Sequence, residues 1–472
     1  MNYLCRHILV MTYIVFCLAA ITPTKTAAES RPRVIVILAD DMGYADLGVT
    51  GCTEIRTPNI DQLSTDGVRF TAAYATASVC CPSRAGLLTG RYQQRFGHEF
   101  NNFSIPTKGF SADDMGLHPD ERTIGNAFQD AGYTTMCIGK WHMGGGEKYD
   151  PANRGFDEVF AIESGNRSYR SYQNDVNQGK RIQLAGGNFL PEEDVTYITD
   201  DLTQAAVDFI DRHQDDPFFI YLSYTAPHTP MQAKDSDLDT YQSIADPRRR
   251  TYAAMMKSLD EGVGRLRATL KDKGLDQNTL IVFTSDNGGA TNNGSDNGIY
   301  RGMKGSKWEG GIRVPFVMTW PEQLNAGQTY DKPISTLDIL PTTLAAIGTT
   351  HQGKPLDGVN ILPYLSGMPD ASPHETLFWR RGVAAAIRSG DWKLLRVEGN
   401  PDLLFNLVDD PSEQTNRAEA HPELVQRLHA ELAKWERELA RPRWTEGKKW
   451  ERNQVLKHQM KINTREQERK YP

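Results

Sequence analysis

The segment from Cys80 to Gly90 has the clearest capacity for chemistry in this sequence, and it reads Cys-Cys-Pro-Ser-Arg-Ala-Gly-Leu-Leu-Thr-Gly. Pro82 suits the first turn of a helix, and the small and apolar residues after Arg84 continue that helix. Cys80 is therefore expected at or just before a helix N-terminus, where free N–H groups and the helix dipole favour an anion. Arg84, one turn further along, adds a planar cation that suits oxyanions.

Two pairs of residues supply oxygen ligands. Asp40 and Asp41 follow one apolar stretch, and Asp286 and Asn287 follow another. Adjacent carboxylates repel each other, so a cation must compensate when both enter one site. A set of oxygen donors favours a hard cation, Ca²⁺ or Mg²⁺, over zinc.

Lysine and histidine side chains complete the set of candidates. Lys140 and His142 share one short segment, and side chains two apart point the same way in an extended chain. His228 follows an Ala-Pro pair, and Lys304 lies in the glycine-containing segment Arg301–Gly305. A single histidine or lysine is more often structural than functional, so these residues carry weight only together.

Four apolar, β-rich stretches run into these polar residues, and such stretches are typical of buried strands in a largely parallel sheet. They are Val34–Ala39, Tyr133–Ile138, Phe218–Tyr224 and Leu280–Thr284. Helical patterns at Asp200–Arg212 and Tyr252–Lys271 alternate with them, which predicts an α/β fold with helices on both faces. Open α/β sheets place their sites at the carboxyl ends of strands, where all four stretches deliver polar side chains.

The pattern Cys-x-Pro-Ser-Arg-x-x-x-Leu-Thr-Gly at Cys80 resembles the signature of the type I, formylglycine-dependent sulfatases. The resemblance extends from about Arg33 to near Ala440. Within this family, the sequence resembles arylsulfatases, N-acetylgalactosamine-6-sulfatases and secreted bacterial polysaccharide sulfatases. It implies an alkaline-phosphatase-like α/β fold, in which helices flank a large, mixed, mostly parallel sheet and a small antiparallel α+β subdomain follows at the C-terminus.

The resemblance also implies a modified residue and a metal. Cys80, rather than Cys81, matches the cysteine that a formylglycine-generating enzyme oxidises to formylglycine (3-oxoalanine), because the signature arginine falls four residues later. One Ca²⁺, favoured over Mg²⁺, would be held by Asp40, Asp41, Cys80, Asp286 and Asn287.

The roles of the other candidates follow from the same resemblance. A gem-diol of formylglycine attacks the sulfur of a sulfate ester, while Arg84 orients the diol. Lys140 and Lys304 bind sulfate oxygens. His142 accepts a proton from the diol, and His228 binds the ester oxygen and protonates the leaving alcohol. Ser164, which follows Gly155-Phe156-Asp157 at a loose spacing, is a further candidate for substrate binding.

These features predict a sulfuric ester hydrolase that acts on a sulfated polysaccharide or oligosaccharide. The segment 165–195 offers a sugar subsite through Arg167, Tyr169, Arg170 and Tyr172, with a structural surface loop as the alternative. Two other functions remain open: a phosphonate or phosphate ester hydrolase of the same superfold, and a non-catalytic binder of sulfated glycans. The sequence leaves open the sugar, the sulfated position, exo or endo action and the oligomeric state.

The N-terminal residues Met1–Ala28 read as an export signal, with a basic start, an apolar run and small residues for cleavage. The run is shorter than a bilayer span, although an uncleaved anchor is the alternative. Cleavage predicts a periplasmic or extracellular protein without a stable membrane span. It also removes two basic residues and so changes the formal charge from −7 to −9, which excludes a generic nucleic-acid binder.

The 472 residues therefore divide into four predicted parts. They are a signal peptide at 1–28, a catalytic domain at 29–363, an α+β subdomain at 364–440 and a basic extension at 441–472. The subdomain combines four short strands with a helix at about Pro422–Ala440. The extension carries ten Lys and Arg residues and four Glu, and it is expected to be solvated or to hold a polyanion. The export signal takes two cysteines with it; the remaining four are Cys52, Cys80, Cys81 and Cys137, whose disulfide state stays open.

Overall fold

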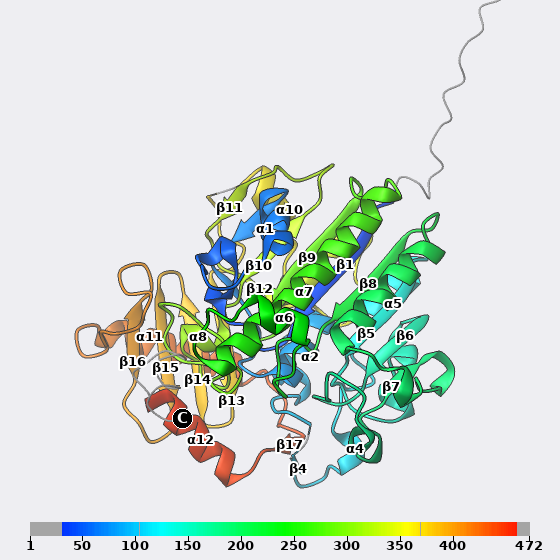
Figure 1. Ribbon diagram of the computed structural model, residues 1–472. Helices are drawn as coiled ribbons and strands as arrows, with labels where there is room; N and C mark the ends of the chain where they lie inside the picture. Colours follow the sequence, from blue (N-terminus) through cyan, green and yellow to red (C-terminus); the bar gives the residue numbers. More distant parts are fainter. Residues whose placement is uncertain (1–30, 103, 369, 460–472) are drawn as a thin grey trace, which may run out of the picture.

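A nine-stranded sheet forms the centre of the protein in a computed structural model, which describes residues 31–102, 104–368 and 370–459 (Figure 1). The strand order is β11-β2-β10-β9-β1-β8-β5-β6-β7. These strands are β1 (Arg33–Ala39), β2 (Val68–Phe70), β5 (Thr134–Lys140), β6 (Glu158–Ile162), β7 (Ile182–Leu184), β8 (Phe218–Ser223), β9 (Thr279–Ser285), β10 (Phe316–Thr319) and β11 (Gln328–Tyr330). The predicted segment Met1–Ala28 lies outside the described residues.

Five neighbouring strands, β9-β1-β8-β5-β6, are parallel, whereas β10 and β7 run antiparallel to the strands beside them. All four apolar stretches identified in the sequence lie in this parallel part. Their carboxyl ends therefore reach one edge of the sheet side by side, which is the arrangement that can gather a site.

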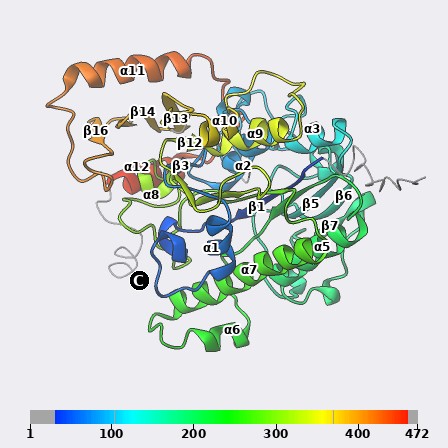
Figure 2. The same ribbon diagram turned by 90° about the horizontal axis from the view of Figure 1, so that it is seen from above.

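Helices cover both faces of the sheet, as Figure 2 shows from above. The helices are α1 (Pro58–Thr65), α2 (Cys80–Thr89), α3 (Ile124–Asp130), α4 (Gln173–Asn177), α5 (Ile198–Arg212), α6 (Asp235–Thr240), α7 (Pro247–Asp272), α8 (Glu309–Ile312), α9 (Ile339–Ala346), α10 (Leu362–Ser366), α11 (Pro422–Glu436) and α12 (Lys448–Gln459). Helices α1, α5 and α7 pack on one face, and α2, α3 and α9 pack on the other.

The two cores follow from side-chain alternation along the strands. In β1, Ile35 and Ile37 join the core under α5 and α7, whereas Val34, Val36 and Leu38 join the core under α2 and α3. Each such side chain is almost completely buried and stabilises the fold by roughly 1.5–3 kcal/mol. A strand buried on both faces must be apolar throughout, which is why these stretches were recognisable in the sequence.

A four-stranded antiparallel sheet with one helix follows the main sheet. Its strands are β13 (Thr376–Arg381), β14 (Ala384–Ser389), β15 (Trp392–Val397) and β16 (Leu403–Asn406). Helix α11 covers it with Leu428, Leu432 and Trp435, and the ring of Trp435 stacks on Phe378 with centroids 5.0 Å apart. The predicted fold class, a mostly parallel α/β sheet with a small antiparallel α+β subdomain, is confirmed.

A buried ionic cluster joins this subdomain to the main sheet. The ammonium of Lys393 on β15 lies 2.8 Å from Glu309 of α8 and 2.9 Å from Glu413, and all three side chains are inaccessible to water. Burial raises the pKa of Glu413 to about 7, because two carboxylates share one ammonium. The contact between the subdomain and the main part of the fold therefore depends on the ammonium of Lys393.

The basic extension differs from its prediction over residues 441–459. Strand β17 (Trp444–Thr445) pairs with β4 (Ile105–Pro106), while β3 (Ala73–Tyr74) pairs with β12 (Ile334–Ser335) elsewhere. Trp444 is buried and donates its indole N–H to the carbonyl of Phe100 at 3.0 Å. In α12, Gln454 and His458 are buried as well. The expectation of a solvated extension is wrong for this part, because apolar and amide side chains among the charges anchor it; residues 460–472 lie outside the described residues.

The search for membrane-spanning segments, confined to the described part of the chain, finds no helix with the length and apolar character that a bilayer crossing requires.

The ionic cluster yields a stability prediction. Replacing Lys393 by Met leaves Glu413 buried without its cation, while Glu309 keeps its ion pair with Arg313 at 3.2 Å, so Lys393→Met should lower the free energy of unfolding by about 3–5 kcal/mol. Denaturant unfolding followed by circular dichroism measures this. Arg396→Met is the matched control on the same strand, because its pair with Glu436 is partly exposed and is worth only about 0.2–1 kcal/mol. Similar losses in the two variants would contradict the role given to the cluster.

Candidate active site

The candidate residues meet at the carboxyl edge of the parallel strands. The strands and their neighbouring segments deliver Asp40 and Asp41 after β1, Asp286 and Asn287 after β9, Lys140 and His142 at and after β5, and His228 after β8. Cys80 is the first residue of α2, preceded by Val79 in extended conformation, as the sequence predicted. Lys304 comes from the long loop between β9 and α8.

Arg84 is the centre of the buried charges at this edge. Its guanidinium lies 2.8 Å from Asp286 through Nη2 and 3.6 Å from Asp40, and Nη1 donates to the carbonyl of Lys140 at 3.0 Å and to the hydroxyl of Ser223. The Lys140 ammonium donates a hydrogen bond to Asp40 Oδ2 at 2.6 Å, so Asp40 lies between two cations. All these side chains are inaccessible to water, so each charge requires its partner.

Asp41 forms the second half of the charge network. Its carboxylate accepts hydrogen bonds from Lys304 Nζ at 2.7 Å and from Asn287 Nδ2 at 2.8 Å, and His228 Nε2 lies 3.5 Å away. Its backbone has a φ of 65°, which is uncommon for a residue other than glycine. An oxygen of this carboxylate, one of Asp40 and a ring nitrogen of His228 lie within 4.8 Å of one another, so the strained backbone at the end of β1 keeps Asp41 in the same charge network as Asp40.

Burial and charge shift the pKa values of the carboxylates in opposite directions. Burial raises the pKa of Asp40, against the effects of Lys140 and Arg84, and burial together with Asp40 raises the pKa of Asp286. Burial also acts to raise the pKa of Asp41, but Lys304 and the other nearby groups outweigh it and the pKa is lowered. Negative charge on Asp40 and Asp286 is therefore less favourable than on Asp41, although both are paired with Arg84.

The donor set at this position fits a hard divalent cation. Asp40 Oδ1 and Asn287 Oδ1 are buried oxygens that accept no hydrogen bond from the described residues. One ligand atom each of Asp40, Cys80 and Asp286 lies within 4.8 Å of the others. Buried oxygens without donors are costly, and a cation such as Ca²⁺ would satisfy them together with Asp41 and Asp286.

Cys80 lies where the helix N-terminus, the cations and these oxygens meet. Its thiol is nearly buried, and burial acts to raise its pKa, but Lys140 and Lys304 outweigh burial and the pKa is lowered. The neighbouring Cys81 points elsewhere: its sulfur lies 2.9 Å from His98 Nε2 and donates to the carbonyl of His142 at 3.0 Å. Cys52, Cys80, Cys81 and Cys137 are all free thiols.

Two histidines flank Cys80 on the open side. Burial and Lys304 lower the pKa of His228 to about 4, and its Nδ1 lies 2.6 Å from the carbonyl of Thr229, so the proton stays on Nδ1 and Nε2 is free to exchange one. Burial and Lys140 lower the pKa of His142 well below its ordinary value. The ring of His142 is covered by Gly165: a Cβ at that position would lie 2.7 Å from Nε2.

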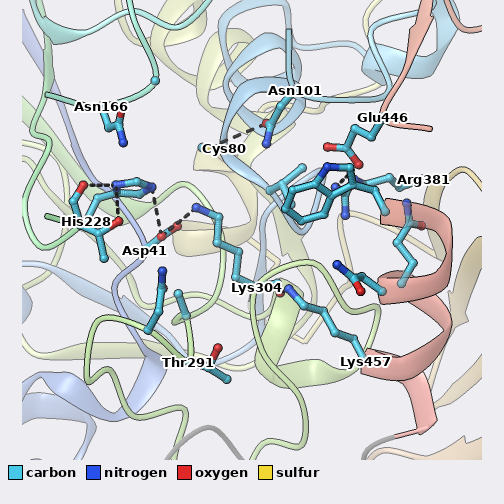
Figure 3. Close-up of a pocket in the computed structure, with 18 of the residues that line it drawn as sticks. Asp41, Cys80, Asn101, Asn166, His228, Thr291, Lys304, Arg381, Glu446 and Lys457 are labelled. Carbon is cyan, nitrogen blue, oxygen red and sulfur yellow. Dashed lines mark hydrogen bonds and ion pairs between the residues drawn. The ribbon is translucent and has the colours of Figure 1, made fainter. Parts of the chain in front are cut away.

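A cavity of about 470 Å³ opens over these groups (Figure 3). Its volume is in the range of small-molecule sites, roughly 300–1,000 Å³. The catalytic candidates that reach its wall are Asp41, Cys80, His142, His228 and Lys304. Lys140 does not reach it, because its ammonium is fully buried behind Asp40.

The predicted sugar subsite in the segment 165–195 is not part of this cavity. Arg167 is buried in an ion pair with Glu192, and the hydroxyl of Tyr169 donates to the carbonyls of Thr225 and His228. Arg170 and Tyr172 are exposed away from the cavity lining. Arg167 and Tyr169 therefore have structural contacts, and none of the four residues lines the cavity, in agreement with the alternative of a structural surface loop.

Ser164 is also not brought to the cavity. Its hydroxyl donates to the carbonyl of Asn166 at 2.8 Å, while Gly165 and Asn166 line the wall instead.

The structure adds cavity residues that sequence reasoning missed. Asn101 and Ser104 come from the segment after α2, Arg381 from the end of β13, and Glu446, Trp450, Asn453, Gln454 and Lys457 from the C-terminal part of the chain. The excess of basic residues after residue 441 was the one signal in the sequence for this wall. Asn101 had no signal at all.

Comparisons with known proteins identify the family of this chain. A model of the Sulfatase family matches residues 32–349. A solved structure named Ps i-CgsB, also crystallised in complex with k-i-k-neocarrahexaose, is 37% identical, covers 91% of this chain and 98% of its own, and superposes with a TM-score of 0.82. Arylsulfatase H of the dog is 32% identical, over 75% of this chain and 76% of its own. N-acetylgalactosamine-6-sulfatase of the mouse is 31% identical, over 80% and 74%.

The fold and the site thus define a hydrolase of the alkaline-phosphatase-like class. The chain belongs to the Sulfatase family and is a sulfatase, that is, a sulfuric ester hydrolase. The family resemblance seen in the sequence is confirmed.

Close packing of Gly165 on His142 yields an activity prediction. In Gly165→Ala, the new methyl group forces the imidazole to move, and a shift of that size should lower kcat of sulfate release roughly tenfold to a hundredfold. Gly145→Ala is the matched control, because its Cβ would find its nearest neighbour, Glu163, only at 3.8 Å. An unchanged kcat in Gly165→Ala, with the protein folded, would contradict a function for His142.

Proposed function

We propose that this sulfatase removes sulfate from a sulfated polysaccharide or oligosaccharide, with a formylglycine made from Cys80 and one Ca²⁺. The observation that carries the proposal is the position of Cys80. It lies at the N-terminus of α2, between buried oxygens without hydrogen-bond donors and a cavity lined by Lys304 and His228.

The two groups that the structure does not contain have defined places. Asp40, Asp41, Asp286 and Asn287, together with the residue at position 80, would hold Ca²⁺, which accepts a larger and less regular set of oxygen ligands than Mg²⁺. When bound, Ca²⁺ supplies positive charge beside the residue at position 80, and the hydrated aldehyde of formylglycine supplies the hydroxyl nucleophile.

The side chains around the cavity do the rest of the chemistry. Lys304 reaches the cavity and stabilises the charge on the sulfuryl oxygens, and its donation to Asp41 shows that the ammonium is already oriented towards the site. Lys140 acts from behind Asp40 by fixing that carboxylate. Arg84 neutralises Asp40 and Asp286 and orients the residue at position 80 from within the same helix.

The proton transfers fall to the two histidines. His228 lines the cavity, and its Nδ1–H donates to the carbonyl of Thr229, so Nε2 is the nitrogen that takes up a second proton; the resulting imidazolium gives this proton to the oxygen that leaves sulfur and returns to the neutral form. A bound sulfate ester adds negative charge beside His228 and opposes the effect of Lys304 on its pKa. His142, which lines the same cavity as Cys80, accepts the proton that the nucleophile must lose.

Several observations support a carbohydrate substrate. Asparagine, threonine and charged side chains line the cavity together with apolar surface, and this combination suits the hydroxyl groups and the apolar ring faces of a sugar. The relative Ps i-CgsB was crystallised with a neocarrahexaose. We infer that the substrate is met outside the cytoplasm, in the periplasm or the extracellular space, because Met1–Ala28 reads as an export signal. Maturation then requires a formylglycine-generating enzyme as a partner.

The first test is the chemical state of Cys80. In a host that makes formylglycine, thiol alkylation followed by mass spectrometry of the tryptic peptide Phe70–Arg84 should show an aldehyde at Cys80 and an alkylated thiol at Cys81. Cys80→Ala should lose all measurable sulfate release and keep its thermal midpoint. Two alkylated thiols in an active preparation would refute the proposed nucleophile.

The second test concerns the metal. Ca²⁺ at 100 times its Kd should add about 2.7 kcal/mol to the stability of the protein after chelation, and Mg²⁺ should add less. Differential scanning calorimetry measures this shift without any substrate. Asn287→Leu should abolish the shift because it removes an unsatisfied oxygen of the site. An equal Ca²⁺ shift in wild type and Asn287→Leu would show that the cation binds elsewhere.

The rival activity is hydrolysis of phosphate or phosphonate esters. A comparison of kcat/KM for sulfate and phosphate esters of one alcohol separates the two, and we expect the sulfate ester to be preferred.

A further inference from the structure

The wall of the cavity opposite His228 has no part in the proposed chemistry. Figure 3 shows Arg381, Glu446 and Lys457 on that side, across Lys304 from Asp41 and His228. The remaining residues of this wall are Trp450, Asn453 and Gln454, all from α12. The basic C-terminal segment thus returns to the site and supplies five of the twenty residues that line the cavity.

Gln454 gives the first indication that this wall receives a ligand. Its side chain is 2% exposed, yet neither its amide nitrogen nor its amide oxygen has a hydrogen-bond partner within the described residues. Native proteins rarely leave a buried amide unsatisfied, because its desolvation is not compensated. Since Gln454 lines the cavity, a ligand with both donor and acceptor groups, such as a sugar hydroxyl, would satisfy it.

The charges of the wall favour an anion. Lys457 donates to the carbonyl of Lys304 at 2.6 Å, and no carboxylate of the described chain lies within 4 Å of its ammonium. Arg381 pairs with Glu446, but its buried Nε has no acceptor among the described residues. Two cations therefore face one carboxylate, which leaves a net positive wall beside the position of the scissile sulfate.

Trp450 adds an apolar surface to the same wall. Its indole is 49% exposed although it lines the cavity. A large, flat side chain held at the mouth of a polar cavity suits the apolar face of a sugar ring. The backbone carbonyl of Lys304 accepts a hydrogen bond from Lys457, so this wall is connected directly to the residue that is proposed to bind the sulfate.

We propose that Arg381 and α12 form a second carbohydrate subsite that binds a sulfated or carboxylated sugar unit next to the unit that loses its sulfate. This inference rests on the proposed function, and it narrows the substrate class to oligosaccharides with negative charge on adjacent units. Trp450 carries the sugar ring, Lys457 and Arg381 bind its anionic group, and Gln454 binds a hydroxyl.

The test uses two neocarrahexaose preparations of equal length. Both carry sulfate on the target unit, and only one also carries sulfate on the neighbouring unit. Lys457→Gln should lower kcat/KM about tenfold on the doubly sulfated substrate, the size expected for one charge-assisted hydrogen bond, and mainly through KM. On the singly sulfated substrate the change should stay below about twofold, within the range of a surface substitution.

Two further variants make the test specific. Arg452→Gln, on an exposed position of α12 that does not line the cavity, is the matched control and should leave both substrates unaffected. Trp450→Ala should raise KM on both hexasaccharides because it removes the ring surface. If Lys457→Gln does not fold, Lys457→Met, which keeps the length of the side chain without its charge, takes its place in the comparison of the two substrates.

The outcomes separate this inference from the proposed function. Equal effects of Lys457→Gln on the two substrates, or a wild-type enzyme indifferent to the neighbouring sulfate, would overturn the subsite. Absence of sulfate release from both substrates would count against the proposed function alone. In that case calorimetric binding of the same hexasaccharides still decides the subsite, because Lys457→Gln should weaken binding only of the doubly sulfated one.

Discussion

One guanidinium determines the geometry of this site. Arg84 contacts the carboxyl ends of four adjacent parallel strands at once: Asp40 after β1, Asp286 after β9, the Lys140 carbonyl on β5 and Ser223 on β8. A buried cation of this kind is stable only if its acceptors stay in place, and those acceptors are stable only if the cation does. These contacts join α2, which begins at Cys80, to the ends of the four strands.

The charges around Arg84 are almost balanced before any ligand enters. Three buried carboxylates face three cations, and the geometry assigns one lysine to each of the two adjacent aspartates. A divalent cation would therefore leave the site with excess positive charge, which suits an anionic ester and the further charge that develops during its hydrolysis. The division also explains why the two lysines differ in position: Lys140 is fully buried, whereas Lys304 reaches the cavity.

The two sides of the cavity come from different parts of the fold. One side consists of strand ends in a sheet buried on both faces, where any displacement would disturb the core. The other side consists of β13, β17 and α12, which the buried Lys393 cluster and the anchors Trp444 and His458 hold against the main sheet. The catalytic candidates are therefore held by the sheet, whereas part of the cavity rim comes from a later part of the chain. With this division, changes in the rim can alter substrate choice without changing the reaction.

The sequence by itself determined the strands, the helix that begins at Cys80 and the set of polar residues at the strand ends. These are local properties: a strand buried on both faces must be apolar along its length, and a helix start has its own residue preferences. It did not determine the far wall of the cavity, nor that Arg167 and Tyr169 would be structural. Only the tertiary structure decided these points. The contacts of Lys304 with Lys457 and of Arg381 with Glu446 join segments that are 153 and 65 residues apart, and a local sequence pattern does not show which distant segments will come into contact.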